Sequence, residues 1–246
     1  MDRLGLFGIA LALVALLGGH ALEGGQIQQL LNLPAALIVV GGSVAAVTIQ
    51  TPRTDFARAI WWLRQLYAYR VPNCYQGLDQ LAYWCGIARK DGLLGLEALA
   101  EKQGDAYTRA GLRLLVDGAS LDCIRASLEI EMVSREQRDI KAARVFESMG
   151  GYAPTLGIIG AVMGLIHVLG NLSQPELLGA GIATAFVATI YGVALANLLL
   201  IPVANRIRAI IQQRYQYQEM VMEGLLLIAD GKTAPMLQQR LKGYLN

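Results

Sequence analysis

Lysine and arginine are missing from two long stretches of this 246-residue sequence, between Arg3 and Arg53 and between Arg144 and Arg206. Charged residues make up only 16% of the chain, against roughly 25% in ordinary globular domains. Every surface element of a soluble protein meets water, so Lys and Arg would be scattered over all of them. The two stretches also hold the longest apolar runs of the sequence. They therefore count against an ordinary soluble domain and favour segments that lie in lipid.

The sequence also lacks the residue patterns of common enzyme and cofactor sites. It contains no phosphate-binding glycine loop, no cluster of metal ligands and no nucleophile elbow. Its three cysteines, Cys74, Cys85 and Cys123, match no zinc or redox spacing, and we expect reduced thiols in a cytoplasmic domain. We therefore expect no enzymatic activity, no metal, no cofactor and no nucleic-acid partner.

Acidic residues are nearly absent from the second basic-free stretch. Between Tyr152 and Ile201 the only one is Glu176. Ion-driven membrane proteins usually need an intramembrane carboxylate that takes up and releases the ion. If this protein handles ions, a partner must supply that carboxylate. His167 lies in the same stretch and has two interpretations, a proton relay or a histidine that is hydrogen-bonded between helices.

Four apolar segments each approach the ~20 residues that cross a hydrocarbon core, the second being the shortest. The first is expected to be retained, because residues 18–21 form a poor signal-peptide cleavage site. Asn32 and Pro34 are typical of a helix start and precede the second segment. The predicted spans are about Leu4–Leu22, Pro34–Thr48, Tyr152–Leu172 and Leu177–Val203.

The loops predict the orientation of these spans. Residues 23–32 and 171–176 contain no Lys or Arg, whereas residues 53–144 and the tail from Arg206 contain twenty. By the positive-inside rule the short loops face outwards, and the middle region and both termini are cytoplasmic. The predicted fold class is all-α, a polytopic membrane protein with four transmembrane helices in two pairs and a helical cytoplasmic domain. The predicted parts are 1–50 (first two spans), 51–150 (cytoplasmic domain), 151–205 (last two spans) and 206–246 (cytoplasmic helical extension).

Helical spacing of apolar residues extends through the middle region and the tail. Asp91-Gly92 predicts a turn before a helical segment at 93–101, and residues 120–146 follow the same periodicity. From Arg206 to Ile228 the chain reads as an amphipathic helix that continues the fourth span. Asp230-Gly231 ends it, and residues 235–245 suggest a short final helix.

Small and polar residues crowd the third and fourth spans, where lipid would not favour them. Gly157, Gly160 and Gly164 could form a groove for another helix, or they could pack within the bundle itself. Threonine hydroxyls beside the glycines favour a path lined for an ion. Pro154 and Pro202 lie near the predicted cytoplasmic ends of their spans, where missing backbone hydrogen bonds create flexing points.

Three segments resemble the flagellar stator A-subunits (the MotA, MotC and PomA group). Residues 154–165 resemble their third-span signature, 181–197 followed by Pro202 are similar to their fourth span, and 88–97 resemble their rotor-facing segment. These matches span most of the chain in the family's order. The resemblance implies a stator subunit of the bacterial flagellar motor, located in the inner membrane. With a MotB-type partner it would form an ion channel whose flow generates torque.

The resemblance also implies the partners. A ring of A-subunits, expected to be a pentamer, would surround a dimer of a B-subunit of the MotB or MotD type. That subunit carries the ion-binding aspartate on its single transmembrane helix and anchors to peptidoglycan. Ion flow would turn the ring, whose cytoplasmic domains would push on the rotor protein FliG. Membrane lipid is the remaining expected partner.

Charged residues of the rotor-facing segment match the family's rotor-contacting pair. These are Arg89 and Glu97, which could share one helix face if a helix continues through Gly92. The alternative interpretation is that both are ordinary solvated surface charges.

Four membrane residues match the family's ion path and torque positions, and a fifth position, Ala161, departs from its sodium-driven members. Pro154 and Pro202 match prolines tied to torque, and Thr155 and Thr189 match polar residues near the ion path. Sodium-driven relatives tend to place Thr where this chain has Ala161. A missing hydroxyl removes a ligand for a hard cation, which prefers oxygen. The resemblance therefore implies a proton motor.

Two other functions compete with the stator hypothesis. One is an ExbB- or TolQ-like proton-driven energiser of outer-membrane processes, although those relatives have one span before the cytoplasmic domain and two after it. The other is a transporter that carries a solute without a partner. The predicted two-and-two arrangement of spans favours the stator.

Overall fold

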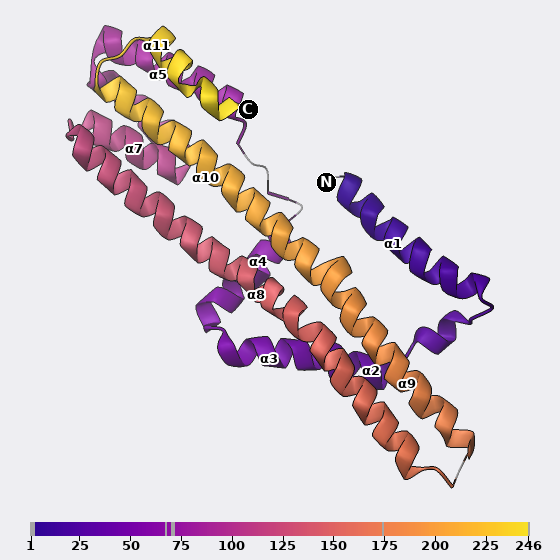
Figure 1. Cartoon of the computed structure of the whole chain (residues 1–246). Helices are drawn as coiled ribbons and strands as arrows, with labels where there is room; N and C mark the ends of the chain where they lie inside the picture. Colours follow the sequence, from indigo (N-terminus) through magenta and orange to yellow (C-terminus); the bar gives the residue numbers. More distant parts are fainter. Residues whose placement is uncertain (1–2, 67, 70–71, 174, 246) are drawn as a thin grey trace. The chain divides into compact units, whose positions relative to one another are not determined.

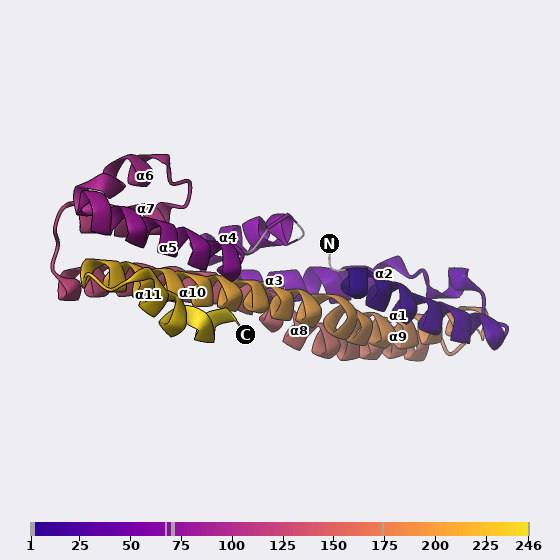
Figure 2. The same ribbon diagram turned by 90° about the horizontal axis from the view of Figure 1, so that it is seen from above.

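The computed structural model describes residues 3–66, 68–69, 72–173 and 175–245, and every regular element in them is helical. Figures 1 and 2 show these helices from two directions. The predicted all-α class is confirmed. In order, the elements are α1 (Arg3–Leu22), η1 (Ile27–Leu30), α2 (Leu33–Ala36), η2 (Leu37–Gly41), α3 (Gly42–Gln50), α4 (Arg53–Gln65), α5 (Cys74–Asp91), η3 (Leu93–Leu96), α6 (Glu97–Lys102), α7 (Ala106–Val116), α8 (Leu121–Gly170), α9 (Pro175–Ala194), η4 (Leu195–Leu200), α10 (Ile201–Ala229), α11 (Ala234–Leu241) and η5 (Lys242–Leu245).

The chain divides into two compact units. The first comprises Met1–Ala68 and Lys141–Ile207, and the second comprises Tyr69–Ile140 and Arg208–Asn246. Helix α8 contributes its first part to the second unit and the remainder to the first, and α10 is likewise shared. Each unit has its own buried residues, so each is described separately.

Apolar helices dominate the first unit. Within the described residues, three helical stretches are long and apolar enough to cross a membrane, namely Ile27–Gln50, the apolar part of Leu121–Gly170 and that of Leu178–Ala229. The apolar stretch of α1, Phe7–Leu22, is shorter. Large side chains such as Phe7, Val14 and Phe186 are at least 66% exposed. Contiguous apolar surface of this kind is rare on soluble monomers, and lipid is the solvent that suits it. The protein is a membrane protein.

The start of the second apolar segment follows the sequence prediction. Asn32 has an extended backbone, and its side chain accepts a hydrogen bond from the Ala35 N–H at 3.0 Å. Pro34 lies in the first turn, where its missing N–H removes no helical hydrogen bond. The predicted cap and proline are therefore confirmed, and they fix where α2 begins.

The second unit is a helical domain with one hydrophobic core. Trp84, Tyr107 and Leu112 from α5 and α7 are at most 3% exposed and pack with the buried faces of α8 and α10. Leu237 and Leu241 of α11 are fully buried against the same core. This alternation of buried and exposed positions is the helical periodicity that the sequence predicts.

One conditional prediction is wrong. A helix that carried both Arg89 and Glu97 would have to pass through Gly92, but α5 ends at Asp91. Gly92 has φ 74° and ψ 177°, a conformation that glycine adopts readily and other residues avoid. The 3-10 turn η3 follows, and Glu97 begins α6. Asp91-Gly92 is thus a turn, as predicted, and it separates the two charged residues onto different helices.

Candidate functional site

Glycines bring α8 and α9 into close contact in the first unit. A Cβ atom at Gly157 would lie 2.9 Å from the carbonyl oxygen of Ala188, and one at Gly164 would lie 2.9 Å from the carbonyl oxygen of Gly181. A Cβ atom at Gly160 would lie 2.8 Å from the Cβ of Ala188. Side chains at these positions would force the helices apart, because backbone atoms cannot rotate away. The three glycines therefore pack within the chain's own bundle, and their surface is not a free groove for a partner helix.

Two predicted ion-path residues lie beside this contact. Thr155 and Thr189 are both exposed, and their hydroxyls donate to carbonyls of their own helices, to Tyr152 at 2.8 Å and to Ala185 at 3.4 Å. The Gly157 Cβ position is 3.4 Å from the Thr189 Cα, so the two threonines lie at similar heights on neighbouring helices. Each hydroxyl oxygen keeps lone pairs that can accept a hydrogen bond.

The other membrane residues of the predicted set lie along the same helix pair. Pro154 is half-buried within α8, where a Cβ at Gly192 of α9 would come within 3.2 Å of its Cα. Ala161 is half-buried one turn beyond Gly157. It brings a methyl group and no hydroxyl. The structure therefore brings Pro154, Thr155, Ala161 and Thr189 onto one pair of packed helices.

Pro202 lies further along the chain, at the second position of α10. The preceding turn, η4, is a π-helix in which the Ile201 N–H donates to the Ala196 carbonyl, five residues back. Proline has no N–H, so a regular α-helix would leave the Leu198 carbonyl without its usual donor. A π turn changes the hydrogen-bond register in front of the proline. The sequence predicts a flexing point here but gives no signal for the wider turn.

A polar cluster that the sequence does not single out joins α2 to α9. The Asn32 side chain donates from Nδ2 to the Thr184 hydroxyl at 2.8 Å, and its backbone N–H donates to the Tyr191 hydroxyl at 3.3 Å. Tyr191 in turn donates to the Leu30 carbonyl. Polar groups in a membrane protein need partners because lipid supplies none. Asn32 thus caps α2, as its residue type predicts, and also binds α9, which neither its spacing nor its residue type predicts.

The predicted rotor-contacting residues lie in the second unit. Arg89 is exposed near the end of α5, and Glu97 is exposed at the start of α6. Arg89 and Lys90 line an open cavity of about 460 Å³ together with Ala234 and Pro235 of α11. Buried Cys85 shares this cavity, and burial raises the pKa of its thiol while Arg89 opposes the shift.

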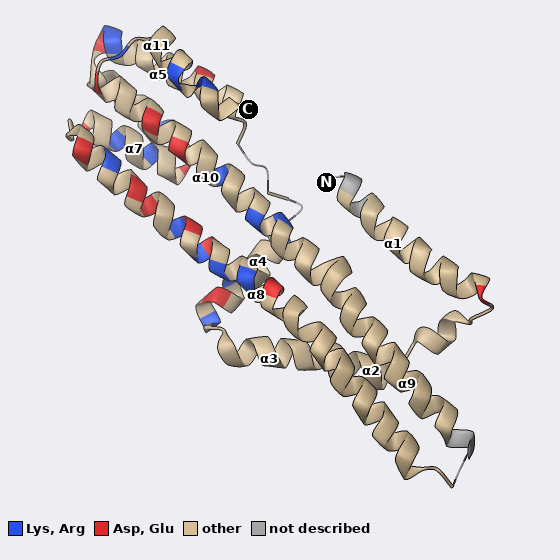
Figure 3. Ribbon diagram, viewed as in Figure 1, with Lys and Arg blue, Asp and Glu red and all other residues tan. Residues whose placement is uncertain are grey.

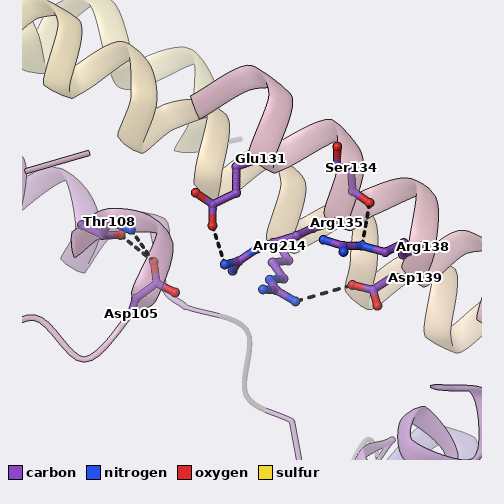
Figure 4. A network of polar contacts seen from close by, with 8 residues as sticks. All are labelled: Asp105, Thr108, Glu131, Ser134, Arg135, Arg138, Asp139 and Arg214. Carbon is purple, nitrogen blue, oxygen red and sulfur yellow. Dashed lines mark hydrogen bonds and ion pairs between the residues drawn. The ribbon is translucent and has the colours of Figure 1, made fainter. Parts of the chain in front are cut away.

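Ion pairs hold the charged parts of α8 and α10 together in this unit. Figure 4 shows the Arg214 guanidinium directed at the Asp139 carboxylate, with a nitrogen–oxygen distance of 3.6 Å. The Asp139 side chain is only 3% exposed, so the pair is largely removed from water. On α8 itself Arg135 pairs with Glu131. The Arg214–Asp139 pair therefore joins α10 to α8, and the Arg135–Glu131 pair lies within α8.

Charge is distributed unevenly along the helices. In Figure 3, the described parts of α2, α3 and α9 show no charged residue, whereas α5, the first part of α8 and α10 carry many. Among the described residues no group of three or more His, Cys, Asp or Glu side chains could hold a metal ion. Between Tyr152 and Ile201 the polar groups are hydroxyls, amides and backbone carbonyls, with the imidazole of His167 and the carboxylate of Glu176 as the titratable side chains besides the tyrosines.

Two family models match the sequence. The one described as "Motility protein A N-terminal" matches residues 6–90, and the one described as "MotA/TolQ/ExbB proton channel family" matches residues 100–220. The motility protein A of Bacillus subtilis is 36% identical over 246 residues, which cover 100% of this chain and 91% of that relative.

Solved structures give the same relationship. The C. jejuni MotAB structure is 30% identical with a TM-score of 0.94, covering 100% of this chain and 96% of the matched one. The flagellar MotAB stator complex from Bacillus subtilis is 36% identical with a TM-score of 0.89, covering 98% and 95%. The resemblance expected from the sequence is confirmed. The chain belongs to the motility protein A family, within the MotA/TolQ/ExbB proton channel family.

Proposed function

We infer that this chain is the A-subunit of a flagellar stator, which forms an ion channel with a MotB-type partner. The exposed hydroxyls of Thr155 and Thr189 on the α8–α9 pair carry the inference. Glu176 is the only acidic residue from Tyr152 to Ile201. Apart from Glu176 at the start of α9, the stretch from Tyr152 to Ile201 can therefore line an ion path but contains no carboxylate. The ion-binding aspartate comes from the partner's transmembrane helix.

The proposed topology has four spans in the bacterial inner membrane, with both termini in the cytoplasm. The spans lie in residues 1–50 and 151–205, and residues 51–150 and 206–246 are cytoplasmic. Basic residues support this orientation, since twenty lie in 53–144 and the tail from Arg206 and none in 23–32 or 171–176. Alkaline-phosphatase fusions within residues 23–32 test it. An inactive fusion there contradicts the four-span arrangement and favours the three-span, ExbB-like one.

The proposed assembly is a ring, a pentamer, of A-subunits around a dimer of the B-subunit. Proton flow between the two drives rotation of the ring. Ala161 supports the proton over sodium, because the side chain at this position supplies no oxygen ligand. Cells that swim on this stator alone should stop when a protonophore is added and should not respond to sodium. Faster swimming with added sodium, together with resistance to the protonophore, contradicts the proton assignment.

Threonine-to-valine variants test the ion path, because valine keeps the shape of threonine and removes the hydroxyl. We expect T155V and T189V to reduce swimming speed and proton conduction when co-expressed with the partner. Thr48 provides a matched control, since it is also exposed and donates to a carbonyl of its own helix at 2.7 Å. Equal effects of T48V and T189V would show that any lost hydroxyl impairs the motor and would remove the support for the path.

The proposed rotor surface contains Arg89 and Glu97, which contact charged residues of FliG. Both side chains are exposed in the second unit, as a contact surface requires. We expect R89E and E97R to reduce swimming in soft agar and a reversed charge in FliG to restore part of it. Arg113, exposed on α7, is the control for charge reversal. An R113E variant as defective as R89E would indicate a general effect of charge.

A further inference from the structure

An apolar cavity lies between α1 and the helix formed by η4 and α10 in the first unit. Its volume is about 350 Å³, at the lower end of the ~300–1,000 Å³ typical of sites for small ligands. Leu198, Leu199 and Val203 supply much of its apolar wall. Pro202 also lines it. Any occupant would therefore contact the proline and part of the π turn that precedes it.

Small residues on one face of α1 create this space. Gly5, Gly8 and Ala12 line the cavity, and a Cβ added at either glycine would meet nothing within 4 Å. The large side chains of Phe7 and Val14 do not line it and are 66% and 68% exposed. Close helix contacts in membranes normally use such small residues to bring two backbones together. Here the backbones stay apart, and the space between them is free for another molecule.

Hydrocarbon is the occupant that fits the size and lining of the cavity. A helix from a second copy is about 10–12 Å across with its side chains. A single acyl chain is narrower and matches the aliphatic walls. In a bilayer such chains are present at high concentration beside every exposed groove.

Arg206 supplies a charged end to this cavity. It is the only charged residue among the lining residues described, and the first basic residue after Arg144. It therefore marks where α10 leaves the apolar zone and reaches the level of lipid headgroups. Basic pockets between transmembrane helices are recognised binding places for anionic headgroups. Both polar lining residues have interactions within the chain: the Asn197 amide donates to the Val193 carbonyl at 2.9 Å, and Arg206 also has a partner. The guanidinium carries five N–H donors, so it can bind a phosphate in addition.

We propose that this cavity binds an anionic phospholipid, with one acyl chain between α1 and α10 and its phosphate beside Arg206. The bound chain fills the space left by Gly5, Gly8 and Ala12 and packs against Pro202. It thereby couples α1 to the part of the chain that the sequence predicts to flex. Apart from Pro202, the residues that line this lipid site are not among the predicted ion-path, torque or rotor-contacting residues.

Native mass spectrometry of the complex with its MotB-type partner tests the site, with phosphatidylglycerol or phosphatidylcholine added to the purified protein. Wild type should retain phosphatidylglycerol preferentially. A12F fills the cavity and should lose most of the bound lipid, whereas V14F places the same ring on an exposed position and should not. R206Q should lower the preference for phosphatidylglycerol about fivefold, and R206K should keep it.

Three results would overturn the proposal. Equal retention of the two lipids by wild type would show that Arg206 does not select an anionic headgroup. Equal retention of phosphatidylglycerol by A12F and V14F would show that the lipid binds elsewhere. If A12F blocks assembly while R206Q leaves lipid preference unchanged, the cavity belongs to a subunit contact. Should A12F fail to fold, R206Q and R206K still decide, because their side chains lie at the end of the cavity.

Discussion

Replacing Gly157 by alanine tests the α8–α9 contact most directly. The added Cβ would lie 2.9 Å from the Ala188 carbonyl oxygen and 3.3 Å from the Gly192 Cα, where ordinary contact begins at 3.4 Å. Relief therefore requires the helices to separate by about 0.5 Å, the difference between 3.4 and 2.9 Å. Both neighbours are backbone atoms, so no side-chain rotation can provide that relief.

Two opposing effects determine how much G157A changes the free energy of unfolding. Alanine favours a helix over glycine by roughly 0.5–1 kcal/mol. Overpacking a well-packed interface costs typically 1–3 kcal/mol. The difference is a destabilisation of roughly 0–2.5 kcal/mol with a centre of about 1 kcal/mol, which corresponds to about 2–4 °C in melting temperature for a chain of this size.

Gly151 is the matched control for this substitution. It also lies in α8, but a Cβ there meets nothing within 4 Å, so G151A keeps the helix-propensity gain without the clash. Thermal unfolding of the purified complex, followed by the fraction that stays soluble and assembled, measures both variants. We expect G157A to unfold below wild type and G151A at or above it. A G157A protein as stable as G151A would refute the close packing of α8 on α9.

Three further predictions concern the second unit. Maleimide should label exposed Cys123 well before buried Cys85, whose pKa is raised by burial; mass spectrometry of intact protein at pH 7 measures the order. R214L should destabilise the protein more than the double variant D139L/R214M, because it removes the arginine partner of a buried carboxylate, a loss that reaches about 3–5 kcal/mol for a fully buried pair. Desolvation raises the folded-state pKa of Glu136 above 4.5, so its charge opposes folding at neutral pH and this penalty fades on acidification. E136Q should therefore raise the melting temperature at pH 7.5 and have no effect below pH 4.5.

Much of the local structure follows from residue type alone. Asn32 and Pro34 begin a helix because one supplies an acceptor for free N–H groups and the other needs no donor. Gly92 ends α5 because it readily adopts a positive φ. The absence of Lys and Arg from two stretches indicates lipid, since charge is costly there. Each of these features depends only on a residue and its near neighbours in the chain, so each can be predicted from the sequence.

Which distant helices pack against each other could be learned only from the tertiary structure. Helical spacing places Gly157, Gly160 and Gly164 on one face, but it does not say which helix covers that face, and α9 does. The bond from Asn32 to Thr184 crosses 152 residues, and no periodicity connects them. The spacing of Arg89 and Glu97 along the chain is compatible with one shared helix face. In the structure the turn at Gly92 places them on two different helices.

The basic-free stretches, the scarcity of carboxylates between Tyr152 and Ile201 and the family resemblance were thus determined by the sequence, because each depends on composition and order. Only the tertiary structure decided that the glycines join α8 to α9, that Thr155 and Thr189 remain exposed beside that contact, and that a cavity separates α1 from Pro202. The physical reason is that packing depends on which backbones approach each other in space. A sequence pattern shows which residues share one face of a helix, and the tertiary structure shows which other helix packs against that face.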